Sequence, residues 1–121
     1  MSKIAYYVGP NDLGELTSKV KCAMIHFDGG SLPPLPLTKR FNKGEEKKGY
    51  EQLKRWVSSA AFTLIILDGF GDAFANLENG KEVATWIKEH SEEEDFPSLL
   101  ITGNRVPLLD YPTISEAKDI L

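Results

Sequence analysis

The stretch "TLIILDGFGD", residues 63–72, decides the fold, because an uninterrupted apolar run ends abruptly on an acid followed by glycines. The stretch "SLLIT", residues 98–102, repeats the pattern and ends on a hydroxyl residue. Apolar runs that do not alternate with polar residues are typical of strands covered on both faces, as in parallel sheets. Two less uniform segments, residues 3–8 and 22–27, are also predicted to be strands, nearer an edge of the sheet.

Amphipathic segments accompany these strands. Apolar residues recur at helical spacing in 50–61 and in 80–90, and strands that alternate with helices build parallel sheets. We therefore predict an α/β fold, a three-layer sandwich with a mainly parallel sheet of four or five strands, flavodoxin-like, in one domain that spans residues 1–121. Residues 28–49 show no periodicity and are predicted to be a long loop or insertion, and residues 112–121 a short helix.

Composition sets limits on the class of protein. The chain has 121 residues, a formal net charge of −4 and scattered Lys and Arg, so we expect no nucleic-acid partner. No apolar stretch approaches the roughly 20 residues that span a bilayer, and the first apolar run is too short for a signal peptide. The single cysteine, Cys22, fits a reducing compartment. We expect a cytoplasmic protein with no membrane association.

Two residues that close predicted strands are candidates for chemistry. Asp68 ends one strand and Thr102 ends another, and ligands of open α/β sheets gather at the carboxyl ends of the strands. A carboxylate beside a hydroxyl would suit a phosphoryl group or a metal ion. The acids that could join Asp68 in holding Mg²⁺ are Asp72 and either Asp12 or Asp28. The spacing alone favours a simpler interpretation, in which Asp68 begins a turn and bonds its own backbone.

His26 lies two residues before Asp28 and raises the question of a metal site of its own. We interpret His26 as a satisfied core or edge histidine.

Two longer segments add a resemblance to a known family. "KKGYEQLKRWVSSAAFTLIILD", residues 47–68, resembles the second helix and third strand of a response-regulator receiver domain. "NGKEVATWIKEHSEEEDFPSLLITG", residues 79–103, resembles the third helix, acidic loop and fourth strand. The resemblance implies that Asp68 matches the phospho-acceptor and that Thr102 matches the hydroxyl residue that senses the phosphoryl group.

The chain also departs from the receiver pattern. Receivers end their first strand on paired acids that bind magnesium, whereas Gly9 and Pro10 stand here, and Asp12 follows about one turn later. An alternative registration makes residues 22–27 the first strand and leaves Asp28 as its only acid. The lysine that follows the fifth strand of receivers is replaced by Tyr111, and a whole helix is missing.

These departures predict a degenerate and truncated receiver-like domain. We expect a non-catalytic signalling or protein-interaction module that uses no cofactor and binds a protein partner or forms a homodimer. One alternative is a magnesium-dependent site at Asp68 and Thr102 that accepts or processes a phosphoryl group. Another is an accessory protein of a phage or mobile element.

Overall fold

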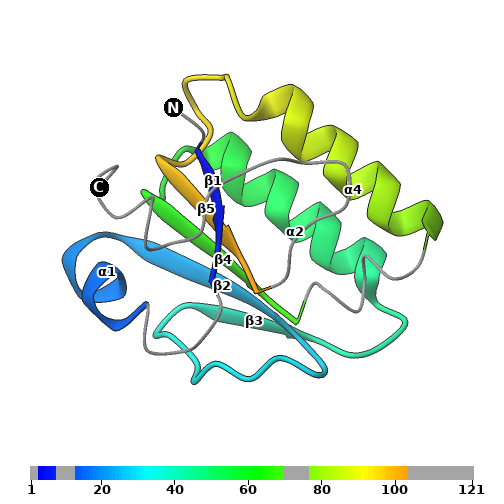
Figure 1. The fold of residues 1–121 in the computed structure, drawn as a ribbon, viewed down its shortest axis with the longest axis horizontal. Coiled ribbons are helices and arrows are strands. Elements are labelled where there is room, and N and C mark those ends of the chain that lie inside the picture. The colour runs from blue at the N-terminus through cyan, green and yellow to red at the C-terminus, as the bar shows by residue number, and fades with distance from the viewer. Residues whose placement is uncertain (1–2, 8–12, 70–76, 104–121) are drawn as a thin grey trace.

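The computed structural model of the chain describes residues 3–7, 13–69 and 77–103, which form a parallel sheet with helices on both faces (Figure 1). The strands are β1 (Ile4–Tyr6), β2 (Cys22–Phe27), β3 (Thr38–Phe41), β4 (Leu64–Asp68) and β5 (Leu99–Thr102). The helices are α1 (Gly14–Lys19), α2 (Glu46–Ser59) and α4 (Leu77–His90). The helix predicted for residues 112–121 lies outside the described residues.

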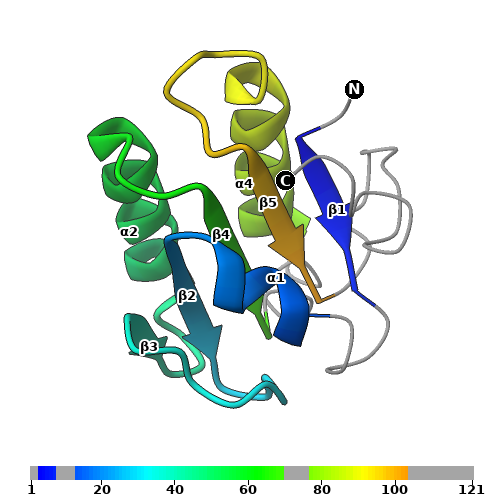
Figure 2. The same ribbon diagram turned by 90° about the vertical axis from the view of Figure 1, so that its left-hand side faces the viewer.

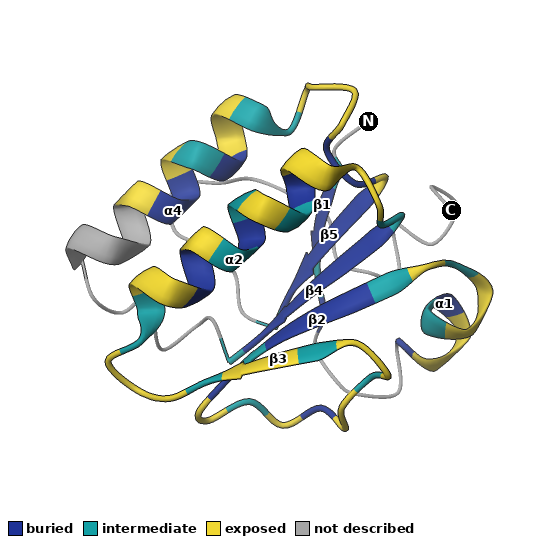
Figure 3. Cartoon of the chain, turned by 180° about the vertical axis from the view of Figure 1, so that it is seen from behind, coloured by how far each residue is buried: buried dark blue, intermediate teal, exposed yellow. Residues whose placement is uncertain are grey.

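The two continuous apolar runs form the centre of the sheet, as predicted. The five strands pair in the order β1-β5-β4-β2-β3, and every pair is parallel. All residues of β4 and β5 are buried, because neighbouring strands flank them and helices or loops cover both faces (Figure 3). The prediction of an α/β fold with a mainly parallel sheet of up to five strands is therefore confirmed.

Helices α2 and α4 cover one face of the sheet, and α1 lies on the other (Figure 2). Leu53 of α2 and Ile87 of α4 belong to the core cluster on the first face. Leu16 of α1 belongs to the cluster on the second face, together with Leu32 from the loop after β2. The longest of these helices have 14 residues, and none in the described ranges is long and apolar enough to cross a bilayer.

The order of the strands identifies the edge where a ligand would bind. Read from β3, the order β3-β2-β4-β5 follows the 2-1-3-4 arrangement of flavodoxin-like sheets, and β1 takes the outer position beside β5. β2 therefore occupies the place of the first strand, which is the alternative registration considered above. The segment after β2 lies on the face of α1, whereas α4, the described element that follows β4, lies on the opposite face. The carboxyl ends of β2 and β4 form a topological switch point, the usual location of ligand sites in such folds.

The segment 28–49 contains more regular structure than predicted. It includes the edge strand β3 and the first turn of α2, so the assignment of the whole segment to a loop was wrong. Only residues 28–37 remain as a loop between β2 and β3, and we call them the crossing loop. This loop passes over the face that carries α1, where Leu32 and Leu35 pack into the core cluster.

Candidate functional site

A row of residues crosses the sheet at the carboxyl ends of the strands. From edge to edge this polar row consists of Tyr7, Gly103, Asp68, His26 and Arg40. The strand register pairs His26 with Asp68 on one side and with Arg40 on the other. Tyr7 and Gly103 come one residue after the last paired residues of β1 and β5. The polar row thus spans all five strands at the switch point.

All side chains of the polar row lie on the face that carries α1. Successive side chains of a strand point to opposite faces. Ile66 and Met24, two residues before Asp68 and His26, both belong to the core cluster under α1. Tyr7 belongs to that cluster as well. The crossing loop lies on the same face and covers Asp68, whereas Arg40 at the edge of the sheet is exposed.

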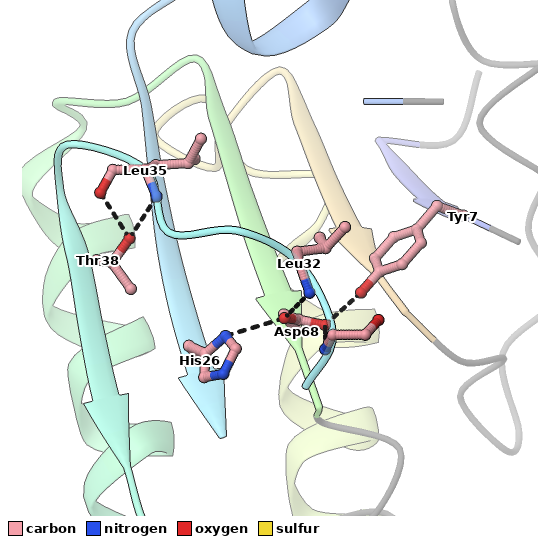
Figure 4. A network of polar contacts seen from close by, with 7 residues as sticks. Tyr7, His26, Leu32, Leu35, Thr38 and Asp68 are labelled. Atoms are coloured by element: carbon pink, nitrogen blue, oxygen red, sulfur yellow. Dashed lines mark hydrogen bonds and ion pairs between the residues drawn. The ribbon is translucent and has the colours of Figure 1, made fainter. Parts of the chain in front are cut away.

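The Asp68 carboxylate is the centre of the site and is enclosed by its own chain (Figure 4). The Tyr7 hydroxyl donates a hydrogen bond of 2.5 Å to Oδ1, and the Ser31 amide donates a longer one of 3.3 Å to the same oxygen. The Leu32 amide donates to Oδ2 at 2.9 Å. His26 Nδ1 also lies 2.9 Å from Oδ2. Asp68 is only 1% exposed.

The hydrogen bonds around Asp68 offset the cost of burying its charge. An isolated carboxylate is strongly disfavoured away from water, whereas one that accepts several hydrogen bonds is stabilised. Burial, and to a smaller extent the hydrogen bond and the charge of Asp68, raise the pKa of Tyr7 well above its ordinary value of 10. Tyr7 therefore keeps its proton and acts as a donor at neutral pH.

The contact between His26 and Asp68 is close but not aligned as a hydrogen bond. Nδ1 is buried and makes no hydrogen bond with the described residues, although it lies 2.9 Å from the carboxylate oxygen. We therefore regard the pair as an electrostatic contact whose strength depends on the protonation of the ring.

Glycines provide the space that the site needs. A Cβ atom on Gly30 would lie 2.6 Å from Asp68 Oδ2, and one on Gly103 would lie 2.6 Å from the Tyr7 hydroxyl. Gly69 has a φ of 82° and packs so closely that a Cβ would lie 2.8 Å from the Phe27 carbonyl oxygen. The acid at the end of β4 is followed by glycine because the backbone after β2 packs directly against that position.

Thr102 does not join Asp68 in the site. β4 and β5 pair in parallel, as predicted, and their carboxyl ends are neighbours. Thr102 is level with Leu67, however, and alternation then places its side chain on the face opposite to that of Asp68. The expectation that the acid and the hydroxyl emerge together was therefore wrong. The residue level with Asp68 is Gly103.

Within the described residues, the structure does not bring together the acids proposed as metal ligands. Asp28 is exposed in the turn after β2, and Asp12 and Asp72 lie outside the described ranges. Within those ranges, no three His, Cys, Asp or Glu side chains are placed to hold one metal ion. The partners of Asp68 are instead donors from Tyr7, directly after β1, and from the crossing loop, segments distant in sequence.

Comparison of the chain with protein-family models, with curated proteins and with solved structures gave no match. The chemical properties of the site therefore follow from its geometry. An enclosed carboxylate with three hydrogen-bond donors ties β1, β4 and the crossing loop together. The His26 imidazole retains contact with solvent, with its side chain 12% exposed.

Proposed function

We propose that the chain is a non-catalytic, pseudo-receiver-like signalling or protein-interaction module that binds a protein partner or a second copy of itself. The observation that supports this proposal is the enclosure of Asp68. A phospho-accepting carboxylate must present one oxygen to the incoming phosphorus in line with the leaving group. Both oxygens of Asp68 instead accept hydrogen bonds from the chain itself.

The surroundings of Asp68 support the same proposal. Phosphoryl transfer depends on cations and donors aimed at the equatorial oxygens of the phosphoryl group. Two of the donors near Asp68 are amides of the crossing loop, and both are used to hold that loop in place. Thr102, the hydroxyl that the receiver resemblance assigns to the phosphoryl group, faces the other side of the sheet.

A second candidate function is a magnesium-dependent phospho-accepting site. It is favoured by the position of Asp68, which ends β4 at the switch point. This function requires the crossing loop to move away, so that the Ser31 and Leu32 amides release the carboxylate. The two functions therefore differ in whether Asp68 becomes accessible in solution.

Intact mass spectrometry after incubation with acetyl phosphate and Mg²⁺ separates the two candidates. The interaction module predicts an unchanged mass for the wild type and for Asp68→Asn. A phospho-adduct on the wild type that is lost in Asp68→Asn, but kept in Asp28→Asn, would establish the second candidate instead.

Association is tested separately by light scattering coupled to size-exclusion chromatography and by affinity capture. The proposal predicts either a dimer or a specific, saturable partner. A monomer at all concentrations that captures no partner would contradict the interaction module.

A further inference from the structure

We propose that His26 and Arg40 form a binding site for a small oxyanion of the phosphate class at the switch point, with Asp68 positioning the His26 ring. This site differs from a phospho-acceptor at Asp68, and it does not depend on whether the domain is catalytic. We expect the His26 imidazole and the Arg40 guanidinium to contact the ligand, while Asp68 stays enclosed.

The two ring nitrogens of His26 have different environments. Nδ1 is buried and lies 2.9 Å from Asp68 Oδ2. Nε2 makes no hydrogen bond with the described residues and is not among their buried, unsatisfied atoms, so it retains contact with solvent. Figure 4 shows the ring with Nδ1 toward Asp68 and its other nitrogen turned away from the carboxylate. Nε2 is therefore the atom available to a ligand.

Asp68 holds the ring in this orientation because the carboxylate is itself fixed. Three donors, the Tyr7 hydroxyl and the amides of Ser31 and Leu32, leave the carboxylate little freedom. A carboxylate next to one imidazole nitrogen can balance the positive charge of the protonated ring, whose other nitrogen then donates to an anion. Such carboxylate–histidine pairs commonly orient a histidine toward a ligand.

Arg40 supplies the second charge. It pairs with His26 in the register of β2 and β3, on the same face, and neighbouring strands lie about 4.8 Å apart. Arg40 is exposed and lies in the edge strand β3, so its guanidinium can reach a ligand that contacts His26. A guanidinium presents paired N–H donors that match the geometry of a phosphate. Lys39, its neighbour in sequence, faces the opposite side of the sheet.

Asp28 is an acid that an anion would meet at this edge, because it is exposed in the turn directly after β2 and its amide donates a hydrogen bond to the Phe41 carbonyl at the end of β3. Its negative charge opposes that of the ligand. The site is therefore expected to be weak, with a dissociation constant for inorganic phosphate on the order of 1 mM. Removing the charge by Asp28→Asn is expected to tighten binding.

The chain contains two histidines, which makes NMR of their ring protons a direct test. His90 lies at the end of α4, contacts Glu93 at 2.9 Å and stacks on Trp86, so it serves as an internal reference. Inorganic phosphate is titrated into the full chain at constant pH and ionic strength. We expect the His26 Cε1–H resonance to shift saturably and the His90 resonance to stay unchanged.

Two matched variants show whether the effect is local. Arg40→Gln is expected to weaken phosphate binding about tenfold, the loss of one charged contact. Lys39→Gln removes the same charge from the opposite face and is expected to change binding less than about twofold. Both residues are exposed, so neither variant should affect folding. Asp68→Asn is first checked for folding by the amide region of its NMR spectrum. This variant is expected to weaken phosphate binding, because the His26 ring loses the carboxylate charge that positions it.

The proposal is overturned if His26 shows no saturable shift, if His90 shifts equally, or if Lys39→Gln weakens binding as much as Arg40→Gln. A parallel titration with O-phosphoserine distinguishes two sources of the ligand. Binding at least as tight as that of phosphate indicates a phosphorylated side chain, and weaker binding indicates a free anion. Either result supports the site.

Discussion

The hydrogen bond between Tyr7 and Asp68 is the contact most open to a quantitative test. Tyr7→Phe removes the hydroxyl and leaves the ring, which packs in the core cluster under α1. A hydrogen bond to a charged group contributes about 1.5–3 kcal/mol. The two amide donors to Asp68 remain in the variant. We expect the free energy of unfolding to fall by about 1.5–3 kcal/mol, measured by urea denaturation.

Tyr50→Phe is the matched control. Tyr50 is also buried, but its hydroxyl makes no hydrogen bond with the described residues. Its ring packs edge-on against Trp86 and lies 4.2 Å from the Lys54 ammonium, contacts that Phe retains. We expect this variant to change the free energy of unfolding by less than about 0.5 kcal/mol.

The pH dependence gives a second, independent readout. Burial, followed by the hydrogen bond and charge of Asp68, raises the pKa of Tyr7 in the folded chain above its ordinary value of 10. The folded state therefore holds this proton more tightly, and the resulting stability is complete below pH 10 and is lost as the pH rises further. The wild type should lose up to about 1.4 kcal/mol more per pH unit above 10 than Tyr7→Phe. The difference between the two proteins should thus shrink in alkali.

A double-mutant cycle with Asp68→Asn tests whether the stability lost in Tyr7→Phe comes from the contact between Tyr7 and Asp68. We expect a coupling energy above about 1 kcal/mol between Tyr7→Phe and Asp68→Asn. If Tyr7→Phe costs no more than Tyr50→Phe, or if its effect is independent of pH, the bond does not stabilise the fold. The account of Asp68 as an enclosed structural carboxylate would then be wrong.

Two further predictions concern packing and are measured by chemical denaturation. Gly103→Ala places a methyl group 2.6 Å from the Tyr7 hydroxyl and is expected to cost about 1–3 kcal/mol. Gly14→Ala, where a Cβ meets nothing within 4 Å, should change stability by less than about 0.5 kcal/mol, and equal losses would contradict the close packing described. Ile66→Ala, in the fully buried β4, is expected to cost about 2–5 kcal/mol. Leu37→Ala, at an exposed position, should cost under about 0.5 kcal/mol, and the reverse order would refute the assigned core.

The central sheet could be predicted from the sequence because its signal is local. Continuous apolar runs identify β4 and β5, and helical periodicity identifies α2 and α4. The predicted start of α2, at residue 50, lies too far along the chain, because the helix begins at Glu46. Apolar periodicity marks only the buried part of a helix, and the first turn of α2 is polar. β3 was missed for a similar reason, because "TKRF" exposes its two central residues at the edge.

The site could be predicted only in part, because its contacts depend on register. That Asp68 ends a strand was visible in the sequence. The face on which Thr102 lies depends on its pairing with Leu67. This pairing joins distant segments, so it could not be predicted from a local sequence pattern. The role of Tyr7 depends on the same register, and on Gly103 leaving room for its ring. His26 was interpreted as a satisfied histidine, whereas its buried Nδ1 contacts Asp68 without a hydrogen bond.

The placement of β1 beside β5 has a consequence for the order of folding. β1 has β5 as its partner strand, so the first of the described strands to leave the ribosome pairs with the last of them. Contacts between such distant segments carry the largest entropic cost and tend to form late. Until β5 is made, the apolar side chains of β1 lack their partner and are exposed to misassociation. We therefore expect β1 to dock last, so that Tyr7→Phe accelerates unfolding and leaves the folding rate nearly unchanged.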